Sequence, residues 1–361
     1  MKKIGIDARL YSQTGVGTYI KNLIHYLDES KIKDERFYLY LMSEDLKKVK
    51  LKNKNIIKRK ADYRWHTLFE QIGFLRAIMK DNLDLMHFTY FSYPVLYRKK
   101  FIATIHDATP LLFKTGRAST KSGIIYALKH FFFRIILKTQ IARAAKIITP
   151  THAVKKELVG IYGGKVMNKA VAIHEGVNYQ MLELKSPAVA KNNYGKFFLY
   201  VGNFYPHKNI ETLIRAFKKI ETDVKLVLVG PDDFFTARLE KYLGDSGKIV
   251  IVKNPPTEKL VFFYKNALAL VHPSLSEGFG LPILEAAYLG CPIIASDIPV
   301  FRELLGKDYL SFDPRSQSDL EEKMSSFISK PVVFSNRNIK KKFSFRLMTD
   351  ETLKIYRAQT A

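Results

Sequence analysis

The sequence of 361 residues has little of what marks secreted or membrane-spanning proteins. Cys291 is its one cysteine, so no disulfide can form within the chain, and we expect a reducing compartment. Asp7 and Arg9 interrupt the amino-terminal segment where a secretory signal needs an apolar run. No stretch approaches the ~20 uninterrupted apolar residues of a membrane-spanning helix. We therefore expect a cytoplasmic protein.

Short motifs for metal and nucleophile chemistry are absent as well. The sequence has no C-x-x-C, no H-E-x-x-H and no G-x-S-x-G, and its histidines and acids do not cluster at metal-ligand spacings. We therefore expect no metal ion and no other cofactor.

Acidic residues are scarce beside basic ones, with 34 Asp and Glu against 59 Lys and Arg and a formal net charge of +25. The excess lies mostly in residues 1–180, and no acid occurs between Ala108 and Lys156. Such a charge attracts polyanions: an anionic membrane, a phosphorylated acceptor or nucleic acid. A lysine-rich composition without a binding role is the alternative. Because no base-reading module is visible, we expect no nucleic-acid partner.

The basic segment 111–146 is also rich in aromatic residues. Its pattern predicts a helix, and a basic, aromatic and amphipathic helix is typical of contact with a membrane surface. A core helix with a solvated basic face explains the pattern equally well. Helical spacing places Ile125, Leu128, Phe132 and Ile135 or Ile136 on one side, beside Phe131 and Phe133, with positive charge from Lys121, Lys129, Arg134, Lys138 and Arg143.

Apolar runs of strand length alternate with helical patterns along almost the whole chain. Short apolar strands separated by helices predict parallel sheets covered on both faces, and the length fits two such domains. The expected fold class is therefore α/β, with two doubly wound, Rossmann-like domains. We place the first domain at 1–180, a linker at 181–195, the second domain at 196–343 and a last helix at 344–361. The expected strands are 2–8, 37–42, 55–60, 84–88, 101–105, 146–149 and 170–174, followed by 196–202, 225–230, 248–252, 268–272, 292–296 and 309–312.

The most informative segment is 270–297, where a strand, a glycine loop and a helix follow one another. Pro282 near the helix start and Gly290 after its end are the expected boundary residues. Loop glycines let backbone N–H groups approach a ligand, and the helix start favours an anion such as a diphosphate. Two carboxylates here could accept hydrogen bonds from the vicinal hydroxyls of a polyhydroxy ligand, although a helix-start acid and a surface glutamate are the simpler explanation. The candidate residues are Glu277, Gly278, Phe279, Gly280, Leu281 and Glu285.

A second candidate loop opens the carboxy-terminal domain after a strand that ends at Gly202. Asn203, His207 and Lys208 lie in this loop, directly before a helix. Lys208 can reach a phosphate as a point charge, and a solvated lysine is the alternative.

Two candidate sites lie in the amino-terminal half. Gly15 and Gly17 follow the first strand in an incomplete G-x-G-x-x-G pattern, which alone is an ordinary turn but stands where ligands bind in open α/β sheets. His106 and Asp107 end the strand 101–105. We interpret His106 as a hydrogen-bond donor to substrate and Asp107 as orienting or structural, with a buried, satisfied histidine as the alternative.

These segments together resemble glycosyltransferase family 4, the retaining enzymes of the GT-B fold. The Glu-x7-Glu pattern with its glycine loop is the most specific part, and the likeness extends over most of the chain. The matching pieces are TGVGTY after the first strand, TIHDATP at 104–110, ARAAKIITPTHAVKKEL at 142–158, YVGNFYPHKN at 200–209, EGFGLPILE at 277–285 and the terminal FSFRLMTDETLKIY.

The resemblance implies a fold, a donor and roles for the candidate residues. The two domains would face each other across a cleft, with the last helix crossing back to the first domain, and the donor would be a nucleotide diphosphate sugar. No metal is expected, because lysine and a helix end would stabilise the leaving diphosphate. Glu277 and the amides after it would hold the transferred sugar, Glu285 the ribose hydroxyls, Lys208 the diphosphate, the Gly15–Gly17 loop the donor phosphate and acceptor, and His106 the transferred sugar.

One departure and one detail refine these expectations. Many relatives have arginine where Asn203 stands, so phosphate neutralisation would depend more on Lys208, with His207 or Arg238 in support. The PHKN wording at 206–209 is similar to that of mannosyltransferases of bacterial surface-polysaccharide assembly, which favours GDP-mannose. The acceptor would then be lipid-linked or an oligosaccharide, and the protein would be peripheral on the inner face of the cell membrane. A nucleotide-sugar 2-epimerase of the same fold and a non-enzymatic polyanion-binding protein are the alternatives.

Overall fold

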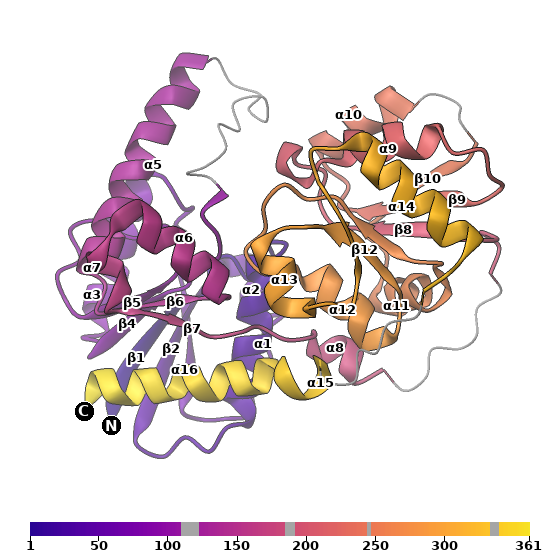
Figure 1. Ribbon diagram of the computed structural model, residues 1–361. Coiled ribbons are helices and arrows are strands. Elements are labelled where there is room, and N and C mark those ends of the chain that lie inside the picture. Colours follow the sequence, from indigo (N-terminus) through magenta and orange to yellow (C-terminus); the bar gives the residue numbers. More distant parts are fainter. Residues whose placement is uncertain (110–122, 185–191, 244–246, 333–338) are drawn as a thin grey trace. The chain divides into compact units, whose positions relative to one another are not determined.

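The computed structural model describes residues 1–109, 123–184, 192–243, 247–332 and 339–361 (Figure 1). The described residues form two compact units. Unit 1 contains the described residues up to Gly176 together with 344–361, and unit 2 contains the described residues of Val177–Phe343. The last helix, α16 (Phe345–Thr360), therefore belongs to unit 1, as the family resemblance implies.

Unit 1 is built on a parallel sheet of seven strands in the order β3-β2-β1-β4-β5-β6-β7. Helix α16 runs along one face of this sheet, and α5 and α6 lie on the other (Figure 1). The strands are β1 (Lys2–Asp7), β2 (Glu35–Leu41), β3 (Ile56–Lys60), β4 (Leu85–Phe88), β5 (Phe101–Thr104), β6 (Lys146–Thr149) and β7 (Ala170–Ala172). The helices are α1 (Val16–Glu29), α2 (Ser43–Leu46), η1 (Glu70–Phe74), α3 (Leu75–Lys80), α5 (Gly123–Arg143), α6 (His152–Tyr162), α7 (Gly164–Met167) and α16.

Unit 2 repeats this arrangement with a parallel sheet of six strands in the order β10-β9-β8-β11-β12-β13. The strands are β8 (Phe197–Val201), β9 (Lys225–Gly230), β10 (Ile249–Lys253), β11 (Leu270–His272), β12 (Ile293–Ser296) and β13 (Leu310–Phe312). The helices are α8 (Tyr179–Leu182), η3 (Pro206–Lys208), α9 (Ile210–Lys218), α10 (Phe234–Leu243), α11 (Thr257–Asn266), α12 (Leu281–Leu289), α13 (Pro299–Leu305), α14 (Gln317–Ser329) and α15 (Ile339–Lys342).

The two sheets confirm the α/β prediction, and every strand expected from the sequence overlaps an observed one. The central strands are buried on both faces, since β4, β5, β8, β11 and β12 have no exposed residue. In each sheet the strand order reverses direction between two central strands, β1 and β4 in unit 1 and β8 and β11 in unit 2. Ligands of doubly wound folds bind at the carboxyl ends of such strands. The candidate residues after β8 and β11 therefore stand where a ligand is expected.

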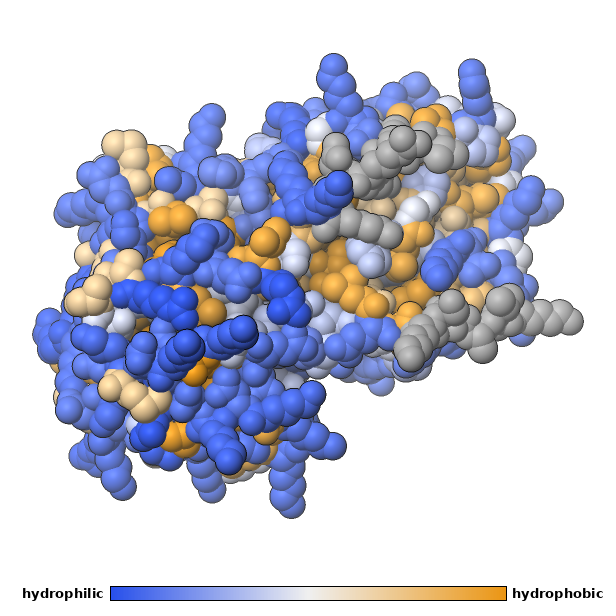
Figure 2. Space-filling model, turned by 90° about the horizontal axis from the view of Figure 1, so that it is seen from below, coloured by the Kyte–Doolittle hydropathy of each residue, from blue (hydrophilic) through white to orange (hydrophobic). Residues whose placement is uncertain are grey.

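Hydrophilic side chains cover most of the face drawn in Figure 2, and apolar ones lie between them in smaller patches. In the described parts of the chain, no helix combines the length and the apolar content that crossing a bilayer requires.

Helix α5 corresponds to the basic, aromatic segment singled out in the sequence. Its carboxy-terminal half packs on the sheet through buried Leu137 and Ile141, and Phe133 and Ile136 are partly buried against the same core. Phe131, Phe132, Ile135, Arg134 and Lys138 are exposed, whereas Arg143 donates hydrogen bonds to the carbonyls of Val95 and Tyr97. Lys121 and the side chains of Ile125, Leu128 and Lys129 lie outside the described residues.

Candidate active site

The loop between β11 and α12 in unit 2 has the strand–turn–helix form predicted from its glycines. Gly280 precedes the helix with φ +90°, and a Cβ there would lie 2.8 Å from the Phe301 ring, so both conformation and space require glycine. Pro282 occupies the first turn, where its missing N–H costs nothing, and Gly290 ends the helix with φ +77°. The backbone thus presents the start of a nine-residue helix at the carboxyl end of the sheet.

Glu277 lies in this loop, and its carboxylate is almost fully buried, with 8% of the side chain exposed. Lys208 Nζ donates to both oxygens at 2.7 and 2.8 Å, and Oε1 also accepts from Ser274 Oγ at 2.7 Å and from His272 Nε2 at 3.0 Å. Burial opposes ionisation, but the charge of Lys208 and the hydrogen bond from His272 outweigh it and hold the pKa of Glu277 well below its ordinary value. Glu277 is therefore a buried carboxylate whose ionised form is stabilised by its neighbours.

Lys208 reaches Glu277 from the loop that follows β8, 69 positions earlier in the chain. Asn209, with φ +60°, turns this loop into α9, and its side-chain amide donates to the carbonyls of Pro273 and Pro314 at 3.1 and 2.9 Å. The backbone N–H of Leu275 donates to the carbonyl of His207 at 2.8 Å. These contacts join the loops after β8 and β11, so the backbone on both sides holds the Lys208–Glu277 ion pair in place. Neither segment of sequence alone predicts this pair.

Three polar atoms around the ion pair are buried without a hydrogen-bond partner within the described parts of the chain: Asn203 Oδ1, His207 Nδ1 and His272 Nδ1. Burial and the charge of Lys208 lower the pKa of His207 to about 4, so its ring is neutral at pH 7. Buried polar groups are normally paired, which makes such atoms expected ligand contacts. Arg238, suggested as an additional phosphate ligand, is exposed on α10.

Glu285 lies one helical turn into α12, and it is buried, with 7% exposed. The interpretation of Glu285 as a surface residue is therefore wrong. Tyr264 Oη donates to its Oε2 at 2.8 Å. Burial raises the pKa of Glu285 to about 7, and the hydrogen bond from Tyr264 only partly offsets this rise. The two glutamates of the Glu-x7-Glu pattern thus have opposite pKa shifts.

The raised pKa of Glu285 makes the stability of unit 2 depend on pH. Between its ordinary value of 4.5 and about 7, the unfolded chain loses this proton before the folded chain does, so the free energy of unfolding falls as pH rises. Because Glu285→Gln stays neutral, its free energy of unfolding lacks this fall. Relative to the wild type, we expect its free energy of unfolding to be higher at pH 7.5 than at pH 4.5 by up to about 3 kcal/mol. Urea unfolding at both pH values measures this difference. Glu258→Gln, an exposed control on α11, should show no such gain; an equal pH dependence in wild type and Glu285→Gln contradicts the burial argument.

In unit 1 the two predicted glycines begin helix α1. Gly15 precedes the helix with φ +64°, and a Cβ on Gly17 would lie 2.6 Å from the carbonyl oxygen of Tyr11. Gly17 is therefore required for the helix start to pack against the preceding turn. The approach of this loop to a donor phosphate stays a prediction.

His106 follows β5 and is 9% exposed. Its Nε2 lies 2.9 Å from the carbonyl oxygen of Thr89, which can only accept, and its Nδ1 lies 3.4 Å from Glu175 Oε1. Tyr19 packs edge-on against the ring, with centroids 4.9 Å apart. Both ring nitrogens thus have partners within unit 1, and the role toward substrate stays a prediction. Asp107 accepts from the N–H of Thr109 at 2.8 Å, consistent with a structural role.

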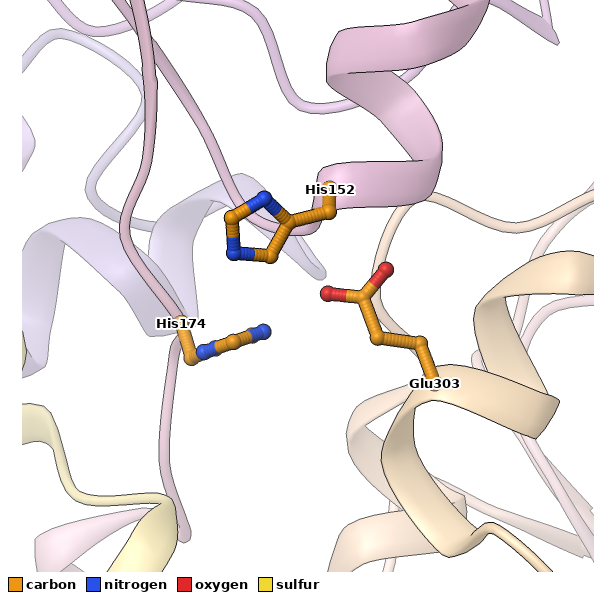
Figure 3. Close-up of side chains that lie close together, drawn as sticks. All are labelled: His152, His174 and Glu303. Carbon is orange, nitrogen blue, oxygen red and sulfur yellow. The ribbon is translucent and has the colours of Figure 1, made fainter.

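Two further histidines of unit 1 lie close together, His152 at the start of α6 and His174 after β7 (Figure 3). Their ring centroids are 5.7 Å apart. Two imidazoles are fewer than the three or four protein ligands of a typical zinc site. Glu303, drawn in the same figure, belongs to α13 of unit 2.

Comparison with known proteins assigns the chain. A family model described as Glycosyltransferase Family 4 matches residues 13–180, and one described as Glycosyl transferases group 1 matches residues 183–343. The chain belongs to glycosyltransferase family 4. The predicted enzyme class is thereby confirmed.

The relatives of this glycosyltransferase include enzymes of surface-glycan synthesis. The O-antigen chain mannosyltransferase RfbU of Salmonella typhimurium is 28% identical over 268 residues, which cover 73% of this chain and 70% of that one. Among solved structures, sucrose-phosphate synthase from Thermosynechococcus elongatus has a TM-score of 0.77 at 18% identity, with 99% of each chain covered. HepE of Anabaena, solved with UDP-glucose, has a TM-score of 0.74 at 14% identity, covering 99% of this chain and 100% of that one. These likenesses confirm the predicted fold class.

Sequence reasoning found Glu277 and Lys208 in unit 2 and His106 in unit 1 of this glycosyltransferase but missed residues that contact Glu277 or His106. His272 was considered only as the end of a strand, and Ser274 and Glu175 were not considered. Each of them gains its importance from a contact that the fold creates: His272 and Ser274 with Glu277, and Glu175 with His106. A signal for the first two was present, because His272 ends β11 and Ser274 follows it at the point where the strand order reverses.

Proposed function

We propose that this glycosyltransferase moves a hexose, with mannose from GDP-mannose as the expected donor, onto a lipid-linked or polysaccharide acceptor of cell-surface glycan synthesis. The observation that carries the proposal is the buried Lys208–Glu277 pair beside the start of α12. The PHKN segment and the likeness to an O-antigen chain mannosyltransferase support mannose. Transfer with retention is part of the proposal and follows from the resemblance to retaining enzymes.

The leaving diphosphate would be stabilised by Lys208 and the first N–H groups of α12. As the sugar–phosphate bond breaks, negative charge develops on the phosphate oxygen, and fixed donors in a site shielded from water stabilise it more than they stabilise the intact donor. An ammonium group has three N–H donors. Two of them point to the oxygens of Glu277, which leaves a third for a phosphate oxygen. The proposal therefore assigns this role to protein groups and includes no metal ion.

The sugar and the nucleoside would be held by the remaining polar groups. Glu277 Oε2 accepts one hydrogen bond from Lys208, so it can also accept from a sugar hydroxyl. Glu285 would bind the ribose hydroxyls, and the unpaired atoms of Asn203 and His207 would contact the donor. In unit 1, His106 and the Gly15–Gly17 loop would serve the transferred sugar and the acceptor.

The strongly basic first half of the chain supports an anionic acceptor or an anionic lipid surface as partner. Residues 1–180 hold most of the net charge of +25, and α5 exposes Arg134 and Lys138. A peripheral position on the inner face of the cell membrane would bring the enzyme to a lipid-linked acceptor.

Thermal unfolding with a panel of GDP, UDP and ADP sugars tests the donor. A ligand selective for the folded state at 100 times its Kd stabilises it by about 2.7 kcal/mol, a shift of several degrees in Tm for a domain of this size. We expect the largest shift with GDP-mannose, and a much smaller one in Lys208→Met. A larger shift with a UDP or ADP sugar overturns the donor assignment.

Product analysis separates the proposed function from its alternatives. Release of free nucleotide diphosphate, stimulated by a lipid-linked acceptor, is the expected result. Interconversion of the nucleotide sugar without nucleotide release would identify a 2-epimerase. No turnover of any nucleotide sugar, with polyanion binding that weakens steeply in salt, would identify a non-enzymatic binding protein.

A further inference from the structure

Three large apolar side chains protrude from unit 1, two directly before η1 and one within it. Leu68 is 80% exposed, Phe69 79% and Ile72 56%. Residues of these types are normally buried, and neighbouring exposed ones mark an interaction surface. We name these three residues the apolar knob.

The apolar knob is held rigidly, because the polar side chains between its members point inward. Glu70, 0% exposed, accepts hydrogen bonds from Arg9 Nη2 at 2.8 Å, from Ser92 Oγ at 2.7 Å and from the backbone N–H of His66 at 2.9 Å. The amide group of Gln71 donates to the carbonyl of Tyr93 at 3.1 Å and accepts from the N–H of Val95 at 2.9 Å. A solvated surface segment would show the opposite orientation, with glutamate outward and leucine inward.

Helix α5 adjoins the apolar knob and adds to the same kind of surface. The ring of His66 lies 5.9 Å from that of Phe133 on α5, centroid to centroid. On this helix Phe131 is 58% exposed, Phe132 53% and Ile135 40%. Two stretches of sequence about 60 residues apart thus both expose apolar side chains around this contact.

The exposed charges in these two stretches of sequence, Tyr63–Lys80 and the described part of α5, are positive. Between Tyr63 and Lys80 the one acid is Glu70, which is buried against Arg9, whereas Arg64, Arg76 and Lys80 are exposed. Among the α5 side chains that the structure describes, from His130 on, the exposed charged residues are Arg134 and Lys138. Apolar side chains bordered by cations match a bilayer surface with anionic headgroups, because the apolar groups enter the acyl boundary while the cations stay with the phosphates.

We infer that the apolar knob and the exposed apolar side chains of α5 insert together into the surface of an anionic lipid bilayer. The inference deepens the proposed function, since it rests on a lipid-linked acceptor, and it adds residues outside the basic segment 111–146 to the membrane contact. The docked enzyme would hold unit 1 at the depth where a lipid-linked acceptor presents its headgroup.

Trp65 offers a direct readout of this insertion. It is the one tryptophan of the chain, it is half-buried at the base of the apolar knob, and the Arg64 guanidinium lies 5.8 Å from its ring. Its fluorescence therefore reports on this site alone. We expect a blue shift, and quenching by brominated lipids, when vesicles of phosphatidylcholine with 30% phosphatidylglycerol (roughly the charge of an anionic leaflet) are added.

A variant with Leu68→Ser and Phe69→Ser tests which residues insert. Because both side chains are exposed, folding should be unaffected, and thermal unfolding checks this. We expect the partition coefficient to fall by roughly 10- to 100-fold, from the apolar area no longer buried. The matched control carries Leu182→Ser and Leu347→Ser, two leucines that are 40% and 50% exposed elsewhere in the chain, and should partition like the wild type.

Several results would overturn the inference. They are unchanged Trp65 emission with anionic vesicles, equal partitioning of the apolar-knob variant and the wild type, or equal binding to pure phosphatidylcholine. Loss of self-association in the variant, without any effect of vesicles on the wild type, would make the knob a protein interface instead. Nucleotide-sugar stabilisation, measured without vesicles, reports separately on the proposed function: its absence would refute the donor site and leave the Trp65 result standing.

Discussion

Glu277→Gln is expected to lower turnover by about 10²–10³-fold, as when one preorganised polar contact to a transition state is removed. The amide keeps the shape of the side chain but loses the negative charge. In the wild type the charged carboxylate orients Lys208 and accepts hydrogen bonds from His272 and Ser274. Affinity for the nucleotide diphosphate should change much less, because Glu277 is assigned to the sugar. Steady-state kinetics and calorimetric titration with the free nucleotide separate the two effects.

The matched control for this substitution is Glu258→Gln, which removes an exposed carboxylate of the same unit. It should have wild-type turnover. Equal losses of turnover and nucleotide affinity in Glu277→Gln would contradict the assigned role. A fall in Tm large enough to explain the lost activity would make Glu277 a structural residue instead.

Arg9→Met is expected to destabilise unit 1 by about 3–5 kcal/mol, the usual cost of removing one partner from a buried ion pair. Arg9 donates to Asp7 at 2.6 and 2.8 Å, to Glu70 at 2.8 Å and to the carbonyl of Tyr63 at 2.7 Å, and Asp7 and Glu70 are at most 1% exposed. Without the guanidinium, two buried carboxylates lose their compensating charge. Urea unfolding followed by Trp65 fluorescence measures the loss in unit 1.

Arg36→Met, at an exposed arginine of the same unit, is the control and should change stability by less than about 0.5 kcal/mol. A loss of under about 1 kcal/mol in Arg9→Met would show that the cluster contributes little to the fold. Because Glu70 positions the apolar knob, the variant is also expected to weaken partitioning into anionic vesicles.

The fold could be predicted because its strands are short, apolar and separated by helices. A run such as KFFLYVG at 196–202 leaves no polar face, which requires burial on both sides and hence a parallel sheet. No single segment of the sequence predicts the order of the strands within a sheet. The sequence predicted the class of doubly wound folds, whereas the order itself was seen only in the structure.

The candidate site could be predicted where the backbone itself carries the signal. Gly280, Pro282 and Gly290 mark the helix by conformational preferences that depend on the residue alone. The partners of Glu277 could not be predicted, because Lys208 lies 69 residues away and the two meet only through the sheet topology. The buried state of Glu285 was missed for the same reason, since Tyr264 belongs to another helix.

The apolar knob shows how a local pattern can mislead about burial. Leu68, Phe69 and Ile72 follow helical spacing, which normally indicates a core-facing stripe. The pairing of Glu70 with Arg9, 61 positions away in the chain, turns the acid inward and these side chains outward. A long-range charge contact thus determines which side chains of this segment are buried.

Helix α16 belongs to unit 1, although it follows the residues of unit 2 in the sequence. Its Tyr356 is fully buried and shares a hydrogen bond of 2.7 Å with His87 of β4. The sheet of unit 1, whose strands are synthesised first, therefore needs a residue that is synthesised among the last. During synthesis unit 2 can fold as soon as its own residues have left the ribosome. Unit 1 cannot complete its fold until residue 356 has also left the ribosome, because α16 covers one face of its sheet. The half of the enzyme that is translated first is therefore the half that matures second.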